Sequence, residues 1–263
     1  MKTAAAAMAV LALASAPAAA APLPRVDHVV VILFENEGRD AVLGSGQAPT
    51  FDRLARNFVD LTNYHALTHP SLPNYVALVS GSTHGIVDDC TACVVGGTTI
   101  GDELTRAGRT WAGYAEGYPS SGRFAKRHMP FLYFPRDRTH VHPLSALRAA
   151  RLPAFAFVAP DVCHDMHDCS VGSGDVWLHR ITPPLLRAPR TVVFILFDEG
   201  TTTVGGGGRV AAIAAGTAVA RHVRYKARTD HYTILRTIED ALRVSPLGAS
   251  ARALPLRGIW RST

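Results

Sequence analysis

Two apolar runs, far apart in the chain, limit the possible folds more than any other feature. Val29–Phe34 is followed by Glu35–Asn36, and Val192–Phe197 is followed by Asp198–Glu199. A continuous apolar run of about six residues, rich in Val and Ile, is typical of a strand buried on both faces in a parallel sheet. Ligands of such sheets bind at the carboxyl ends of the strands. The sequence therefore predicts a site at one edge of a sheet that is rich in oxygen ligands.

The side chains at these two strand ends are of the kind that binds a divalent cation. Ca²⁺, Mg²⁺ and Mn²⁺ prefer oxygen ligands, and Zn²⁺ tolerates them. The alternative is that each pair only caps a following helix, because acidic side chains are favourable near helix N-termini. Two such pairs on two apolar strands favour a metal site formed by Glu35, Asn36, Asp198 and Glu199.

Strands and helices are expected to alternate along the remaining chain. Besides a first strand within 25–36 and a strand at 192–197, we expect strands at 111–115, 154–158 and 210–215. Helices are expected at 51–58, 73–79, 100–107, 176–181 and 232–242, with Thr50 and Asp230 as N-caps of the first and the last. Pro183-Pro184 is expected to stop the fourth helix, and the glycines within 204–209 to form a flexible loop. The pattern predicts a single α/β domain over residues 21–263, with a mostly parallel central sheet and helices on both faces.

Residues 1–20 have the pattern of a cleaved secretory signal peptide. Lys2 precedes an apolar segment, and the small-residue triplet Ala18–Ala20 follows it. Pro17 interrupts the apolar segment, which is shorter than the roughly 20 residues that a membrane span requires. The sequence therefore predicts a secreted protein with no stable membrane anchor.

The four cysteines fall into two local pairs, Cys90 with Cys93 and Cys163 with Cys169. An exported protein meets oxidising conditions, in which four cysteines predict two disulfides. Two local bridges are favoured because each closes a short loop without bringing distant segments together. A zinc site built from all four is the alternative, but the second spacing does not match a paired Cys-x-x-Cys site.

The net charge of +6 and the isoelectric point of about 9.4 bear on the kind of partner. Arginine is spread along the chain without a dense Lys/Arg run, which argues against a nucleic-acid partner. A mildly basic surface favours anionic substrates, phosphate esters included.

Residues 69–75, His-Pro-Ser-Leu-Pro-Asn-Tyr, place the hydroxyl of Ser71 just ahead of an expected helix. Backbone N–H groups at a helix N-terminus bind a phosphate and favour an attacking oxyanion. Serine is a weak nucleophile at its ordinary pKa, and a coordinated metal ion is one way to activate it. The pattern therefore indicates a nucleophile, with helix capping by Ser71 as the alternative.

The loop at 160–170 concentrates acidic and imidazole side chains around two cysteines. These side chains are Asp161, His164, Asp165, His167 and Asp168. Metal ligation, proton transfer and surface polarity all remain open for them. His231, beside the expected cap Asp230, is placed to bring an imidazole to the same sheet edge.

Five motifs resemble those of one family: ENE at 35–37, THPSLPNYVALVSGSTHGI at 68–86, PDVCHDMHDCS at 160–170, FDEG at 197–200 and DHYTILRTIEDAL at 230–242. They follow one another as in the bacterial and fungal phosphoesterase family of secreted acid phosphatases and phospholipases C. That family belongs to the alkaline phosphatase-like superfamily. The resemblance extends over residues 27–243 and implies an alkaline phosphatase-like fold.

The resemblance implies a metal-assisted acid phosphatase that hydrolyses phosphate monoesters through a phosphoserine at Ser71. The short chain resembles the small acid phosphatases of the family more than its large phospholipases C. Some small members act on phosphoinositides, so a phospholipid head group is a candidate substrate. Two other functions stay open: a phospholipase C-type phosphodiesterase and a non-catalytic protein that binds phosphate ligands.

Further side chains are candidates for the chemistry at Ser71. His69 and His231 are candidates for proton transfer or phosphate contact, since His titrates nearest neutral pH. The candidates for substrate contact are Asn74, Lys126, His128 and His167, with Arg127 in the same basic segment. Family members with two metal ions use additional Asp and His ligands, which would correspond here to Asp161, Asp165 or His231.

Overall fold

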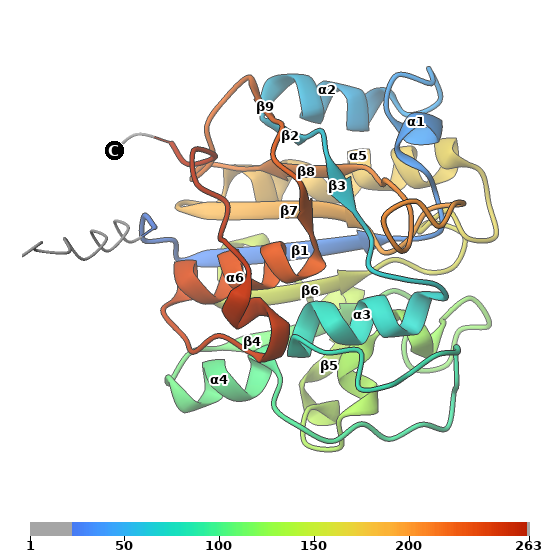
Figure 1. Cartoon of the computed structure of the whole chain (residues 1–263), viewed down its shortest axis with the longest axis vertical. Helices are drawn as coiled ribbons and strands as arrows, with labels where there is room; N and C mark the ends of the chain where they lie inside the picture. The colour runs from blue at the N-terminus through green and yellow to red at the C-terminus, as the bar shows by residue number, and fades with distance from the viewer. Residues whose placement is uncertain (1–22, 262–263) are drawn as a thin grey trace, which may run out of the picture.

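An eight-stranded sheet with the strand order β5-β4-β6-β1-β7-β8-β2-β9 organises the computed structural model, which describes residues 23–261 (Figure 1). Its strands are β1 His28–Phe34, β2 Val59–Leu61, β4 Trp111–Ala115, β5 Val141–Pro143, β6 Phe155–Ala159, β7 Thr191–Phe197, β8 Ala212–Ala215 and β9 Val223–Tyr225. A second, two-stranded sheet pairs β3 Tyr64–His65 with β10 Thr229–Asp230. The predicted signal peptide at 1–20 lies outside the described residues.

The centre of the large sheet is parallel, as the two apolar runs predict. β1 pairs in parallel with β6 on one side and with β7 on the other, and all seven residues of β7 are buried. Within the part of the chain that the structure describes, β8 alone runs antiparallel to its neighbours in this sheet. The prediction of a mostly parallel sheet is therefore confirmed.

Helices cover both faces of the sheet, which completes the predicted α/β architecture. The α-helices are α1 Arg39–Val42, α2 Pro49–Asn57, α3 Ser71–Ser80, α4 Ile100–Arg106, α5 Val171–Arg187 and α6 His231–Leu242. Short 3-10 helices occupy Lys126–His128, Pro130–Tyr133, Arg138–His140, Leu144–Ala146, Ala149–Arg151 and Gly248–Arg252. In Figure 1, α3 and α6 lie together in front of the strands, whereas α5 lies behind them and packs against α2.

An aromatic cluster fixes the carboxyl ends of the two central strands. The last residues of β1 and β7, Phe34 and Phe197, stack with ring centroids 5.4 Å apart. Phe51 of α2 and Trp177 of α5 meet the edge of the Phe34 ring at 5.1 and 5.9 Å. Because these rings are buried and interlocked, the residues that follow each strand leave it in a fixed direction.

The helix α5 is longer than the sequence predicts. A helix at 176–181 was expected to end before Pro183-Pro184, but α5 begins at Val171 and runs through both prolines to Arg187. Each proline removes one N–H donor from the helix. The side chains of Leu178, Thr182 and Leu185 are buried on the face of α5 that packs on β7, and this packing outweighs the local preference.

The start of α2 also differs from the prediction. Thr50 is not the N-cap, because the helix begins at Pro49 and Ala48 is the cap residue, without a side-chain hydrogen bond. Asp175 of α5 caps α2 instead, since its Oδ1 accepts from the backbone N–H groups of Thr50 and Phe51 at 2.8 and 3.0 Å. The capping group comes from a distant part of the chain, which local sequence cannot reveal.

Other boundaries shift by a few residues. α3 starts at Ser71 rather than at residue 73, β8 starts at residue 212 rather than at 210, and β6 is one residue later than expected. Asp230 caps α6 as predicted, with its Oδ1 3.0 Å from the N–H of Thr233.

Both predicted disulfides are present, Cys90–Cys93 and Cys163–Cys169, and no free cysteine remains among the described residues. Over residues 23–261, every helix is too short or too polar to cross a membrane.

Candidate active site

Three buried carboxylates meet where β1 and β7 end. Phe34 and Phe197 are register partners, so Glu35 and Asp198 follow neighbouring strands at the same edge of the sheet. One oxygen each from Glu35, Asp198 and Glu199 lies within 4.8 Å of the others. The acidic cluster that the two apolar runs predict is therefore formed.

Burial and mutual repulsion make this acidic cluster electrostatically unfavourable when it carries no cation. Burial raises the pKa of Asp198 well above its usual range, and the charges on Glu35 and Glu199 raise it further. Burial and the Glu35 charge likewise raise the pKa of Glu199 to about 7. Glu35 is the exception, because the nearby His128 charge overcomes the effect of burial and lowers its pKa.

Asn36 contacts the acidic cluster through its backbone. Its N–H donates to Asp198 Oδ1 over 3.1 Å, and its φ of 56° turns the chain sharply at the end of β1. The side chain of Asn36 is exposed. The structure thus shows Asn36 orienting Asp198, and its predicted role as a metal ligand stays a prediction.

Ser71 is the first residue of α3 and faces the acidic cluster. Its hydroxyl donates to Glu199 Oε1 over 3.3 Å, and the residue is 3% exposed. The next backbone N–H, that of Leu72, donates to Asp89 Oδ1 over 2.9 Å. Ser71 is therefore fixed between the N-terminus of a helix and a carboxylate able to accept its proton.

His69 orients the same carboxylate. Its Nδ1 lies 2.9 Å from Glu199 Oε2, and its Nε2 lies 2.9 Å from the backbone oxygen of Thr202. A carbonyl oxygen only accepts, so Nε2 carries a proton and the contact at Nδ1 needs a second proton, on His69 or on Glu199. The imidazole is partly exposed and both of its nitrogens are engaged, so the structure shows His69 orienting Glu199, and its predicted proton transfer stays a prediction.

Asn74 stabilises the turn that carries Ser71. It is fully buried, and its Oδ1 accepts from the N–H groups of Leu67 and Thr68 at 3.0 and 3.2 Å. Its Nδ2 donates to the backbone oxygens of Thr68 and Pro70 at 2.8 and 3.2 Å. With these four contacts made, Asn74 shapes the loop that carries Ser71, and its predicted contact with a substrate stays a prediction.

The glycine run after β7 packs on this loop. A Cβ on Gly206 would lie 2.0 Å from the backbone oxygen of Leu67, and one on Gly207 would lie 2.3 Å from that of Thr68. The N–H of Gly207 also donates to the Ala66 oxygen over 3.2 Å. The expected flexible loop is instead a close backbone contact that supports the Ser71 turn.

His128 bridges two carboxylates beneath the site. Its Nε2 lies 2.6 Å from Glu35 Oε1 and its Nδ1 lies 2.7 Å from Asp165 Oδ2, while its ring stacks on Tyr75. Burial opposes the charge on His128, but the two carboxylates prevail and raise its pKa to about 9. Both nitrogens are engaged, so His128 holds Glu35 in place. Neither nitrogen is free for the substrate contact that the sequence suggests.

The loop closed by Cys163–Cys169 is attached to the end of β1. The N–H of Glu35 donates to the backbone oxygen of Asp165 over 2.9 Å, in addition to the bridge through His128. Asp165 thus supports Glu35 through both its backbone and its side chain.

Lys126 and His167 have different surroundings from those expected. Lys126 Nζ donates to the Thr91 backbone oxygen over 2.6 Å and lies 4.5 Å from the centre of the Tyr133 ring, so it braces the Cys90–Cys93 loop. His167 Nδ1 lies 2.6 Å from Asp168 Oδ1, and its ring lies 6.0 Å from that of His128. Of the two, His167 lies closer to the acidic cluster.

Two acidic side chains, Asp89 beside Ser71 and Glu116 beside the loop at 160–170, were not predicted. Asp89 binds the Leu72 N–H and lies 3.8 Å from Arg127 Nε, which places a guanidinium beside the start of α3. Glu116 forms a second group with Asp161 and His164, with one ligand atom of each within 4.8 Å of the others. Asp161 therefore lies apart from the main acidic cluster, and neither Asp89 nor Glu116 stands in a motif that would have identified it.

His231 is placed behind the acidic cluster. It is fully buried, its Nε2 donates to the backbone oxygen of Asp198 over 2.7 Å, and its Nδ1 lies 2.5 Å from the Tyr64 hydroxyl. Because Nε2 donates, Nδ1 accepts from Tyr64. Burial lowers the pKa of His231 to about 4. The structure therefore gives this imidazole a neutral, orienting position and no contact with Ser71.

The sequence is similar to that of one protein family over most of its length. The model of the Phosphoesterase family matches residues 45–245. The chain is 33% identical over 258 residues to a phosphatidylinositol-3-phosphatase of Mycobacterium tuberculosis, covering 90% of this chain and 84% of that protein. It is 29% identical over 228 residues to the phosphate-repressible acid phosphatase of Penicillium chrysogenum, covering 74% of this chain and 55% of the fungal protein. The chain thus spans little more than half of the fungal relative.

Solved structures agree with this at the level of the fold. A protein of the alkaline phosphatase superfamily from Vibrio parahaemolyticus has a TM-score of 0.63 at 12% identity, covering 88% of this chain and 71% of that one. The murine ectonucleotide pyrophosphatase/phosphodiesterase 5 has a TM-score of 0.56 at 12% identity, covering 84% and 96%. The predicted alkaline phosphatase-like fold is confirmed.

Proposed function

The chain belongs to the Phosphoesterase family and is a phosphoric ester hydrolase; from this premise we propose that it is a secreted, metal-assisted phosphomonoesterase with Ser71 as its nucleophile. The observation that carries the proposal is the 3.3 Å contact between Ser71 Oγ and Glu199 within a cluster of three buried carboxylates. The names of the relatives, phosphatidylinositol-3-phosphatase and acid phosphatase, support a monoester substrate and suggest a phospholipid head group.

The donor set fits a divalent cation. Glu35 Oε2 and Asp198 Oδ2 are buried without a hydrogen-bond partner among residues 23–261, and Glu199 completes the set of carboxylates. Buried anionic oxygens of this kind are stabilised by a hard or borderline cation, and Asn36 would add an amide oxygen. A bound cation would lower the pKa of the nucleophile and neutralise a phosphate oxygen.

The residues of the chain account for the proton movements. Ser71 Oγ forms a bond to phosphorus as the bond from phosphorus to the leaving oxygen breaks, and the Ser71 proton passes to Glu199. His69, 2.9 Å from Glu199 and partly exposed, would give a proton to the leaving alcohol by releasing the bond from its Nε2 to the Thr202 oxygen. Water then hydrolyses the phosphoserine, which releases phosphate and restores the hydroxyl.

Arg127 and the N-terminus of α3 supply positive potential for the phosphoryl group. The guanidinium lies near Asp89, which itself holds the Leu72 N–H, so both groups are ordered beside Ser71. A phosphate at this position would interact favourably with both the arginine and the helix terminus. His167, which the sequence suggests as a substrate contact, lies beside this arginine, with its Nε2 3.3 Å from Arg127 Nη2.

The proposal is tested by comparing para-nitrophenyl phosphate with its bis-ester, before and after chelation, with metal analysis of the purified protein. A phosphomonoesterase hydrolyses the monoester faster and loses activity with its metal. Faster turnover of the bis-ester would identify a phosphodiesterase, and binding without turnover of either would identify a binding protein. Full activity of protein shown to be metal-free would exclude metal assistance.

Secretion is tested separately by expressing the full chain in its host and fractionating the culture. We expect the exported form to begin at Ala21, after cleavage of residues 1–20. Intact Met1 on protein retained inside the cell would contradict this proposal.

A further inference from the structure

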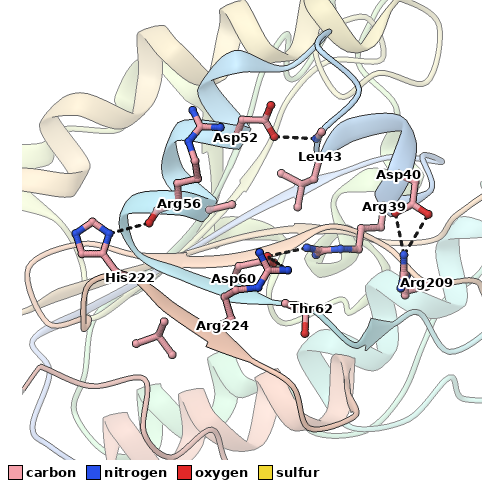
Figure 2. A pocket seen from close by; sticks show the side chains of 13 residues that line it. Arg39, Asp40, Leu43, Asp52, Arg56, Asp60, Thr62, Arg209, His222 and Arg224 are labelled. Atoms are coloured by element: carbon pink, nitrogen blue, oxygen red, sulfur yellow. Dashed lines mark hydrogen bonds and ion pairs between the residues drawn. The ribbon is translucent and has the colours of Figure 1, made fainter.

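A second cavity lies at the β9 end of the sheet and shares no lining residue with the acidic cluster. Its volume is about 590 Å³, and its walls come from α1, α2, β2 and β9 together with Arg209 (Figure 2). Five of its lining side chains are basic: Arg39, Arg56, Arg209, His222 and Arg224. This concentration of arginine distinguishes the cavity from the acidic cluster at Ser71.

Two of the four arginines are neutralised within the cavity. Arg39 Nη2 donates to Asp60 Oδ2 over 2.7 Å in a buried ion pair. Arg209 Nη2 donates to both carboxylate oxygens of Asp40, at 2.8 and 3.1 Å, on the rim. Figure 2 shows both pairs, Arg39 with Asp60 and Arg209 with Asp40.

The other two arginines keep their charge available. The Arg224 guanidinium is 71% exposed, and its closest carboxylate oxygen is 3.9 Å away on Asp60, which already holds Arg39. Arg56 is exposed, and its only contact drawn in Figure 2 is from His222 Nδ1 to its backbone oxygen, at 3.0 Å. Arg224 thus has one long contact to a carboxylate that Arg39 already holds, and Arg56 lies one turn after Asp52 on α2, whose Oδ1 accepts from the Gly44 N–H.

The floor of the cavity also offers an acceptor. Asp60 is 4% exposed, and its Oδ1 is buried with no hydrogen-bond partner among the described residues, although Oδ2 is held by Arg39. A buried carboxylate oxygen of this kind is stabilised by a donor such as a hydroxyl. The cavity thus has two exposed guanidinium groups at its mouth, the carboxylates of Asp40, Asp52 and Asp60 in its lining, and one Asp60 oxygen without a donor.

We propose that this cavity binds a phosphorylated polyol: Arg56 and Arg224 hold the phosphoryl oxygens, and a neighbouring hydroxyl donates to Asp60 Oδ1. Arginine suits the anion because its planar fork pairs with two phosphoryl oxygens at once. The acceptor on Asp60 selects against a bare anion, since a ligand without a hydroxyl leaves this oxygen without a donor. The site binds and does not catalyse, because none of its residues meets Ser71.

Calorimetric titration with phosphonates tests the proposal, because their carbon–phosphorus bond is not cleaved by a phosphoesterase. The wild type is compared with the double variant Arg56→Gln/Arg224→Gln, and with Arg53→Gln, which removes an exposed arginine of α2 that does not line the cavity. We expect the double variant to bind 2-hydroxyethylphosphonate at the cavity about tenfold or more weakly than the wild type does. Its kcat and KM for para-nitrophenyl phosphate should stay at the wild-type values, as should those of the control.

The ligand series tests the role of Asp60. At the sites that depend on Arg56 and Arg224, 2-hydroxyethylphosphonate should bind more tightly than ethylphosphonate or inorganic phosphate. Identical isotherms for the wild type and the double variant would overturn the proposal. Equal binding of the three probes would overturn the polyol assignment.

Vesicle flotation separates the two sources of such a ligand. Binding to phosphatidylcholine vesicles that contain phosphatidylinositol, lost in the double variant, would support a lipid head group. Binding of free inositol phosphate without vesicle binding, again lost in the double variant, would support a soluble ligand. Binding that the double variant retains in both experiments would overturn the site.

Discussion

At the scale of single residues, the carboxylates of Glu35, Asp198 and Glu199 determine what Ser71 can do. A neighbouring group orients each of them: His128 contacts Glu35, the Asn36 N–H donates to Asp198, and His69 contacts Glu199. These contacts leave Glu35 Oε2 and Asp198 Oδ2 without partners, and Ser71 Oγ is the hydroxyl placed against the group. The proposed nucleophile and the proposed cation site thus form a single arrangement.

Ser71→Ala should lower kcat for para-nitrophenyl phosphate by about a thousandfold or more, because it removes the nucleophile. The substitution deletes one oxygen at the start of α3 and should leave the unfolding transition nearly unchanged. Thr68→Ala is the matched control, since Thr68 precedes the same turn and its hydroxyl donates only to the His69 backbone oxygen. If Thr68→Ala were inactive and Ser71→Ala active, the nucleophile would be Thr68.

Asp198→Asn should weaken metal binding by about a hundredfold or more and reduce activity with it, because a buried anionic ligand becomes neutral. Metal content of the dialysed protein and calorimetric titration with Mn²⁺ or Zn²⁺ measure the effect. Asp27→Asn, just before the other end of β1, is the control and should bind metal as the wild type does. Unchanged metal content in Asp198→Asn would remove Asp198 from the ligand set.

His231→Ala should destabilise the fold by about 1–3 kcal/mol, because it leaves the Asp198 carbonyl and the Tyr64 hydroxyl buried without partners. It should also weaken metal binding, because the Asp198 peptide loses its anchor. Tyr64→Phe, which keeps the bond to Asp198, should have a smaller effect on both. Loss of turnover with normal stability and metal affinity would instead assign His231 a catalytic role.

At the scale of elements, backbone contacts between loops hold the Ser71 turn. Gly207 packs on Thr68 with no room for a side chain, and Asn74 closes the same turn from within. The glycines therefore serve close approach rather than mobility.

Gly207→Ala should lower both stability, by about 1–3 kcal/mol, and kcat, because its Cβ would lie 2.3 Å from the Thr68 backbone oxygen and displace the Ser71 turn. Denaturant unfolding and steady-state kinetics measure the two effects. Gly122→Ala is the control, since a Cβ at Gly122 meets no atom within 4 Å. Normal kinetics in a folded Gly207→Ala protein would show that the glycine contact does not position Ser71.

Short-range patterns predict the elements that fill the core. The strand at Trp111–Ala115 and the helix at Ile100–Arg106 follow closely from apolar spacing, and the acidic ends of β1 and β7 follow from their apolar runs. What the sequence does not reveal depends on distant partners. Asp175 caps α2 from another helix, and packing on β7 carries α5 through two prolines. The sequence suggests a substrate contact for His128. It does not reveal the two carboxylate partners, Glu35 and Asp165, because both lie far from His128 along the chain.

At the scale of the whole molecule, a buried carboxyl group couples stability to pH. Glu239 of α6 is fully buried and accepts from the Leu247 N–H at 2.9 Å and from the Ser250 hydroxyl. Burial raises its pKa to about 8 from an ordinary value of 4.5. Between these values the folded state keeps a proton that the unfolded state releases, so stability falls as pH rises through this window.

Glu239→Gln should remove this part of the pH dependence. Between about pH 5 and about pH 8.5 the wild type should lose on the order of 1 kcal/mol or more that the variant does not lose. Chemical denaturation at both pH values measures the difference, with Asp240→Asn, its partly exposed neighbour, as the control. Parallel pH profiles for the wild type and Glu239→Gln would contradict the assignment.

The ring closed by Cys163–Cys169 connects the candidate active site to the oxidation state of two cysteines. Asp165 lies inside this ring and holds Glu35 through its backbone oxygen and through His128. In a reducing compartment the two thiols stay apart, and the support behind Glu35 loses its covalent closure. We therefore expect reduction of this disulfide to lower the activity, which kcat for para-nitrophenyl phosphate before and after reduction measures.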